Sequence, residues 1–229
     1  MKHLPVSING LAPLLPEDLE RLHERLSALN YNDDRGFGFR EIDADSTTVS
    51  ATLVKRTPTF IPEFDPYLNQ IVRKEIYLFS EIDFSIDANY ELLEIFDTLK
   101  NASKVRIALR PLLSKNIRLF SINLAPFEVI PKLSKDTQRL DIERLSVRNF
   151  KYAKGIVGRF DMKVENTELA LDIMKKYSHE VTRASVKLTA DGFEETHVRI
   201  YDSGHLIISC EEEDFDRKFK GLKNILFAE

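Results

Sequence analysis

Residues 196–208 of the chain read THVRIYDSGHLII, two runs of alternating polar and apolar side chains around Asp202-Ser203-Gly204. Alternation with a period of two is typical of strands that have one buried face. A three-residue loop pairs Tyr201 with His205 and keeps the apolar side chains on one face, whereas a two-residue loop would scatter them. That apolar face comprises Val198, Ile200, Leu206 and Ile208. The stretch therefore predicts a β-hairpin packed on a core.

The segments around this hairpin give the order strand, helix, three strands, helix. Residues 156–164 alternate as a strand, Asn166 offers a helix cap, and apolar residues then recur at helical spacing up to Tyr177. Another strand is predicted at residues 184–188, and Asp191-Gly192 supplies the turn that follows it. The closing helix carries one apolar stripe, which consists of Phe215, Phe219, Leu222 and Leu226. We expect this stripe to pack on the sheet.

The first half of the chain has nearly the same order. A helix begins at Pro16, and a second helix runs through residues 102–112. The predicted strands are residues 6–11, 36–43, 48–56, 71–86 and 91–96. An irregular insertion is expected at residues 57–69, because this segment contains Pro58, Pro62 and Pro66. Residues 115–154 are expected to be a connector with some strand or helix of their own.

The order strand, helix, four strands, helix resembles one half of the TATA-binding-protein fold, which is a saddle made of two such halves. In the second half of the chain, residues 196–208 look like that family's strand, Ser-Gly turn and strand. A long helix with basic residues follows directly, and these are Arg217, Lys218, Lys220 and Lys223. The resemblance implies an α+β fold of two pseudo-repeats, each an antiparallel sheet with helices packed on one face. The expected organisation is an N-terminal repeat (1–114), a connector (115–154) and a C-terminal repeat (155–229).

Composition indicates an ordinary globular protein. Of the 229 residues, 43% are hydrophobic and 31% are charged, and no segment has the run of about 20 apolar residues that a membrane helix needs. The N-terminus lacks the apolar segment of a signal peptide. The single cysteine, Cys210, excludes an internal disulfide framework and is expected to be a buried small hydrophobe. We therefore expect a cytoplasmic protein that does not associate with membranes.

Charge separates the two halves. Residues 1–114 hold 13 Lys and Arg against 18 Asp and Glu, whereas residues 115–229 hold 20 against 19. The alternation places most cations of the second half, with one tyrosine, on the strand face opposite the apolar one. The predicted set is Arg159, Lys163, Arg183, Lys187, His197, Arg199, Tyr201 and His205, and the same face also carries the acidic residues Asp161 and Glu195. Cations suit phosphates and an aromatic ring suits a stacked base, so we predict a non-enzymatic protein that binds DNA or RNA here.

An alternative prediction uses the first half. Its strand face is anionic and aromatic, and it includes Tyr77, Phe79 and Glu81. Such a surface fits an adaptor subunit that docks an enzymatic protein partner in a larger complex. Salt separates the two alternatives, because phosphate binding weakens steeply with salt and an aromatic-centred interface does not.

Other chemistries have weaker signals. Residues 35–39, RGFGF, look like the aromatic strand of the RNA-recognition motif. That motif, however, needs another strand between its first helix and this one. The glycines also suit a turn that lets Phe37 and Phe39 pack.

Carboxylates at residues 41–45 and 81–87 fit a magnesium-dependent nuclease or, equally, strand ends and turns. His197 and His205 alone do not make a zinc site. No phosphate-binding loop or nucleophile elbow is present. We therefore predict no catalytic residues, no metal and no cofactor.

Overall fold

The structure is a computed structural model, and it describes residues 1–190 and 193–227. Its strands are β1 (Lys2–Ala12), β2 (Phe37–Ala44), β3 (Thr48–Asp65), β4 (Gln70–Asp87), β5 (Leu92–Ile95), β6 (Arg118–Ser121), β7 (Arg139–Ala153), β8 (Ile156–Lys163), β9 (Val181–Ala190), β10 (Phe193–Tyr201) and β11 (His205–Cys210). Its α-helices are α1 (Pro16–Ala28), α2 (Leu99–Leu109), α3 (Pro126–Asp136), α4 (Thr167–Lys176) and α5 (Phe215–Phe227). The predicted turn at Asp191-Gly192 lies outside the described residues.

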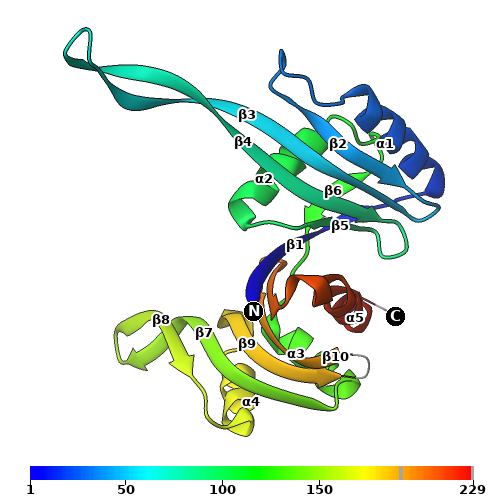
Figure 1. Cartoon of the computed structure of the whole chain (residues 1–229). Coiled ribbons are helices and arrows are strands. Elements are labelled where there is room, and N and C mark those ends of the chain that lie inside the picture. Colours follow the sequence, from blue (N-terminus) through cyan, green and yellow to red (C-terminus); the bar gives the residue numbers. More distant parts are fainter. Residues whose placement is uncertain (191–192, 228–229) are drawn as a thin grey trace.

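All of these strands belong to one sheet (Figure 1). Its order is β2-β3-β4-β5-β1-β11-β10-β9-β7-β8, with β6 beside β1. Neighbouring strands within the described residues pair antiparallel. Strand β1 joins the two halves, because residues 2–7 pair with β11 and residues 7–10 pair with β5. The expectation of an α+β protein built on an antiparallel sheet is therefore confirmed.

The two sets of helices lie on opposite faces of this sheet. Val6 and Ile8 of β1 pack in a core with α3, α4 and α5, whereas Leu11 packs in a second core with α1 and α2. The neighbours Leu92 and Leu93 of β5 are divided between the two cores in the same way. Since successive side chains of a strand point to opposite faces, α3, α4 and α5 leave the other face of the second half uncovered.

The hairpin at residues 196–208 has the predicted register. Tyr201 pairs with His205, and the four predicted apolar side chains of β10 and β11 are buried. Gly204 has a φ of 79°, and a Cβ atom there would come within 2.7 Å of the Ile8 carbonyl oxygen. The loop therefore needs glycine both for its left-handed backbone and for its close approach to β1.

The irregular insertion predicted at residues 57–69 is wrong. Strand β3 continues to Asp65 and pairs with β4 along its whole length, so the two strands form an arm that projects beyond β2 (Figure 1). The Arg56 amide donates a hydrogen bond to the Gly36 carbonyl on the side away from β4. Pro58 and Pro62 point their nitrogens the same way, so neither proline removes a hydrogen bond from the β3–β4 ladder.

Residues 115–154 contain β6, α3 and β7. Strand β7 belongs to the second half of the sheet, where it pairs with both β8 and β9.

Helix α4 begins as predicted, because the Asn166 side chain accepts hydrogen bonds from the amides of Glu168 and Leu169. Phe219 and the two leucines of the α5 stripe are buried, and Phe215 is half-buried. Cys210 is also buried, as predicted, and burial raises the pKa of its thiol.

Candidate nucleic-acid interface

The predicted cationic residues lie on the uncovered sheet face of the second half. The strand register aligns them in rows that run across the strands. One row contains Arg183, Tyr201 and His205, and a second row contains Lys187 and His197. Arg199 lies between these rows on β10, while Arg159 and Lys163 extend the face onto the edge strand β8. We call this surface the open face.

Acidic residues on the open face neutralise part of its charge. Arg183 lies 2.9 Å from Asp161, and Lys187 lies 2.5 Å from Glu195. A hydrogen bond from Ser146, together with the charges of nearby arginines, lowers the pKa of Asp161. A hydrogen bond from Lys187 does the same for the pKa of Glu195. These carboxylates are therefore charged at neutral pH, and they neutralise Arg183 and Lys187.

Three other cations form a row without an acidic partner. Lys163 pairs across the strands with Arg144, Arg144 with Ser185, and Ser185 with Arg199. Within residues 1–190 and 193–227, none of these three cations makes an ion pair, and the Ser185 hydroxyl, in a residue only 8% exposed, has no hydrogen-bond partner. We call Lys163, Arg144, Ser185 and Arg199 the cation row. It is the part of the open face best suited to bind an anion.

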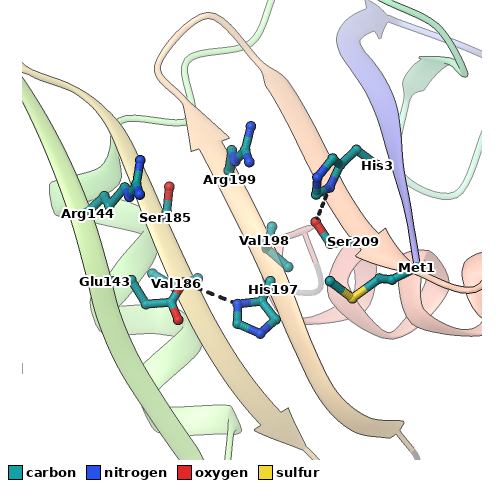
Figure 2. A pocket seen from close by; sticks show the side chains of 10 residues that line it. All are labelled: Met1, His3, Glu143, Arg144, Ser185, Val186, His197, Val198, Arg199 and Ser209. Atoms are coloured by element: carbon teal, nitrogen blue, oxygen red, sulfur yellow. Dashed lines mark hydrogen bonds and ion pairs between the residues drawn. The ribbon is translucent and has the colours of Figure 1, made fainter. Parts of the chain in front are cut away.

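A pocket of about 250 Å³ lies beside the cation row (Figure 2). Four of its polar side chains pair with one another. His197 Nδ1 lies 3.2 Å from a carboxylate oxygen of Glu143, and His3 Nδ1 lies 2.7 Å from the Ser209 hydroxyl. Arg144, Ser185 and Arg199 also line the pocket, so the cation row forms one of its sides.

Sequence reasoning missed Arg144, Glu143, Ser185, Ser209 and His3. Arg144 and Glu143 belong to β7, whose register shifts between Ile142 and Arg144, so two successive side chains face the same surface. His3 reaches the pocket because β1 pairs with β11, some 200 residues later in the chain. Local periodicity contains no signal for such a pairing, although the alternation of β9 and β11 could have placed both serines on the open face.

Tyr201 and His205 lie at the end of the open face nearest the loop of the hairpin. Their ring centroids are 5.5 Å apart with the planes tilted by 52°. His205 is only 6% exposed, and burial lowers the pKa of its imidazole. The half-buried Tyr201 ring is therefore the part of this pair that a ligand can reach.

The residues predicted for partner docking lie where the arm leaves the sheet. The Arg56 guanidinium lies 4.4 Å above the Tyr77 ring, Phe79 contacts the Tyr31 ring edge-on, and Glu81 lies 3.8 Å from Arg40. Residues 57–78 of the arm include eight exposed large apolar side chains. Those on the same face as Tyr77 and Phe79 are Phe60, Phe64 and Ile71.

The weaker candidate sites have structural explanations. Phe39 of the RGFGF segment is buried in the core against Phe84, and a Cβ atom at Gly38 would come within 2.4 Å of the Tyr31 Cα. Asp45 caps a turn by accepting hydrogen bonds from Thr47 and Thr48, which lowers the pKa of its carboxyl to about 2. Across the described parts of the chain, no group of three His, Cys, Asp or Glu side chains is arranged to hold a metal ion.

A scan against protein-family models finds no match for this chain, and a search of curated proteins finds no significant match. No helix within the described residues is long and apolar enough to cross a bilayer.

Proposed function

We propose that this protein binds single-stranded nucleic acid on the open face. The observation that carries the proposal is the cation row, in which Lys163, Arg144 and Arg199 have no acidic partner among the described residues. A charge left unneutralised on a protein surface favours an anionic ligand, and a line of cations suits a polyphosphate backbone. Strand spacing places successive side chains of the row about 5 Å apart, so the row extends over more than one phosphate.

Tyr201 supports the choice of a single strand. Its ring lies two positions along β10 from Arg199, on the same face. Bases of a single strand are free to stack on an aromatic ring, whereas a duplex keeps them inside. Contacts to phosphate and stacking carry little sequence information, so we expect binding with low sequence specificity.

The test is binding of a short labelled single strand, RNA or DNA, measured by fluorescence anisotropy between about 50 and about 200 mM salt. We expect salt-sensitive binding by the wild type. Replacing Arg144, Lys163 and Arg199 together by Glu should abolish it. The control replaces three exposed lysines on the helices of the opposite face, Lys132, Lys135 and Lys220, by Glu and makes the same change in net charge.

The control variant should keep most of the wild-type affinity. Absence of binding by the wild type would refute the proposal. Equal losses in the two triple variants would also contradict it, because they would show that only net charge matters.

A second candidate function is that of an adaptor, and the arm favours it. Exposed apolar surface on this scale marks interaction sites, and an isolated two-stranded hairpin is marginally stable on its own. In this proposal, Tyr77, Phe79 and Glu81 form the base of a protein-docking surface. The test compares proteins that co-purify with the intact chain from its native host and with a variant whose arm, residues 57–78, is replaced by an Asn-Gly turn. A protein partner that disappears only with the arm would support the adaptor.

The relationship to the TATA-binding-protein fold also stays a proposal. Residues 1–114 have the element order β1-α1-β2-β3-β4-β5-α2, which is the expected strand, helix, four strands, helix. The second half has the strand order β8-β7-β9-β10-β11, in which β7 lies between β8 and β9. Superposing the two halves tests the proposal: matched strand order and helices would support a common unit, and no alignment beyond the strand pairs would contradict it.

A further inference from the structure

The pocket beside the cation row contains two histidines from distant parts of the chain. His197 of β10 pairs with Ser209 of β11, and Ser209 pairs in turn with His3 of β1. Two strand spacings, about 10 Å, therefore separate the backbones of His197 and His3 on the same face. This separation leaves room for a phosphodiester group with a hydrogen bond to an imidazole on either side.

Each imidazole is held through its Nδ1 atom. The Glu143 carboxylate can only accept a hydrogen bond from His197, so Nδ1 of the neutral ring carries the proton and Nε2 has the lone pair. Nε2 lies 3.9 Å from a carboxylate oxygen of Glu195, which is beyond hydrogen-bond distance. His3 Nδ1 lies 2.7 Å from the Ser209 hydroxyl, which can accept a hydrogen bond from the protonated ring, so Nε2 of that imidazolium carries the proton that can be given away. Figure 2 shows both rings beside the pocket, each joined to its partner. One ring is thus prepared to accept a proton and the other to donate one.

Positive charge and a hydroxyl donor lie next to this pair. Arg199 is two residues from His197 on the same strand face, and its cross-strand neighbour is Ser185. Arg144 follows Ser185 in the cation row and lines the same pocket. Guanidinium groups bind the non-bridging oxygens of a phosphate in a planar fork, and they stabilise the charge that accumulates on these oxygens during phosphoryl transfer.

We propose that this pocket cleaves RNA by internal transesterification, an activity that rests on the proposed nucleic-acid binding and goes beyond it. His197 Nε2 takes the proton of a ribose 2′-hydroxyl, and the 2′-oxygen attacks the adjacent phosphorus. The bond from phosphorus to the 5′-oxygen of the next nucleotide breaks, and His3 gives that oxygen a proton. The products are a 2′,3′-cyclic phosphate and a 5′-hydroxyl. No water or other reactant is consumed.

The volume of the pocket agrees with this assignment. About 250 Å³ is below the range of roughly 300–1,000 Å³ that is typical of small-molecule sites, so the pocket is too small to enclose more than part of a longer strand that lies over the sheet. The 2′-hydroxyl distinguishes RNA from DNA chemically, because only RNA carries the internal nucleophile. We therefore expect the protein to bind both single strands and to cleave only RNA.

The experiment incubates the full chain with end-labelled single-stranded RNA in the presence of EDTA and identifies the product ends. We expect 2′,3′-cyclic phosphate ends from the wild type and no cleavage of an RNA with a 2′-deoxy residue at the cleaved position. His197→Gln and His3→Gln should each lower the rate at saturating RNA by a factor of roughly 10² to 10⁴, while RNA binding persists and the unfolding temperature is unchanged. The control is His23→Gln on α1, which lies outside the pocket and should keep the wild-type rate.

A modified substrate separates the two roles. An RNA with a 5′-bridging sulfur has a leaving group that departs without a proton, so this substrate should restore the rate of His3→Gln and not that of His197→Gln. Binding of RNA without cleavage by the wild type would overturn the cleavage proposal and leave the binding proposal intact. Unchanged cleavage by the double histidine variant would also overturn it. Absence of RNA binding would overturn the proposed function itself.

Discussion

The Lys223 ammonium lies 2.7 Å from the Asp87 carboxylate, and all but a small part of both side chains is buried. The same ammonium lies 2.8 Å from Glu94. Lys223 belongs to α5 in the second half, whereas Asp87 and Glu94 belong to β4 and β5 in the first half. One cation shared by two buried carboxylates therefore ties the terminal helix to the opposite half of the sheet.

Removing that cation should destabilise the whole chain. We expect Lys223→Met to lower the free energy of unfolding by about 3–5 kcal/mol, because two buried carboxylates lose their counter-charge. Urea denaturation measures this change. On the same helix, Lys220 is exposed, and Lys220→Met should change the free energy by less than about 0.5 kcal/mol. Similar values for the two variants would show that the ion pairs do not join the halves.

The Phe219 side chain should contribute strongly to stability through packing. It is 5% exposed and lies edge-on to Phe96, with ring centroids 5.7 Å apart. Truncation to Ala leaves a cavity between α5 and the sheet, so we expect a loss of about 3–5 kcal/mol in urea denaturation. The half-buried Phe215 provides the comparison, and Phe215→Ala should cost less. An equal or larger loss at Phe215 would contradict this account of the helix.

His205 makes stability depend on pH. Burial lowers its pKa below the ordinary value of 6.5, so the folded chain binds fewer protons than the unfolded chain between the two pKa values. This contribution to stability is complete above pH 6.5 and is lost as the pH falls through the lowered pKa. His205→Phe keeps an aromatic ring beside Tyr201 and cannot titrate. We expect the variant to gain stability relative to the wild type when denaturation is repeated at about pH 5 instead of about pH 7.5. A constant difference would contradict the prediction.

Paired and unpaired cations of the open face should differ in their effect on binding. Arg144→Gln combined with Arg199→Gln removes two cations without acidic partners in the described chain, so the salt slope should shrink by about 0.7 for each phosphate that the variant no longer neutralises. Arg183→Gln combined with Lys187→Gln removes two cations that Asp161 and Glu195 already neutralise. The second variant should lose less affinity and less salt dependence in the anisotropy assay. Equal effects would mean that the ion pairs open when the ligand binds.

Local patterns in the sequence were sufficient to predict the hairpin at residues 196–208 and the Asn166 cap, because alternation and capping depend on near neighbours. They also placed Arg183 and Arg199 on one face, since a period of two specifies which residues share a face. The same alternation placed Asp161 on that face, but its ion pair with Arg183 was not predicted, because β7 lies between their two strands.

Long-range pairing and irregular backbone account for what was not predicted. The position of His3 depends on β1 pairing with β11, and that of Arg144 depends on a shift of register within β7. The arm was predicted as irregular because prolines are rare in strands, but Pro58 and Pro62 occupy positions where no ladder hydrogen bond is needed. The helices of the two halves lie on opposite faces because Val6 and Ile8 of β1 pack in one core and Leu11 packs in the other. In the sequence, all three are ordinary apolar strand residues, so nothing in it predicts this division.

The most direct test of nucleic-acid binding on the open face is to locate the contact itself. Ultraviolet crosslinking of the wild-type chain to single-stranded RNA, followed by mass spectrometry of the crosslinked peptides, identifies residues that touch bases. Binding on the open face predicts crosslinks in β10, with Tyr201 as the principal site, and their loss when Arg144, Lys163 and Arg199 are replaced by Glu. Crosslinks confined to the arm at Tyr67 or Tyr77, or no crosslink in β10, would contradict it.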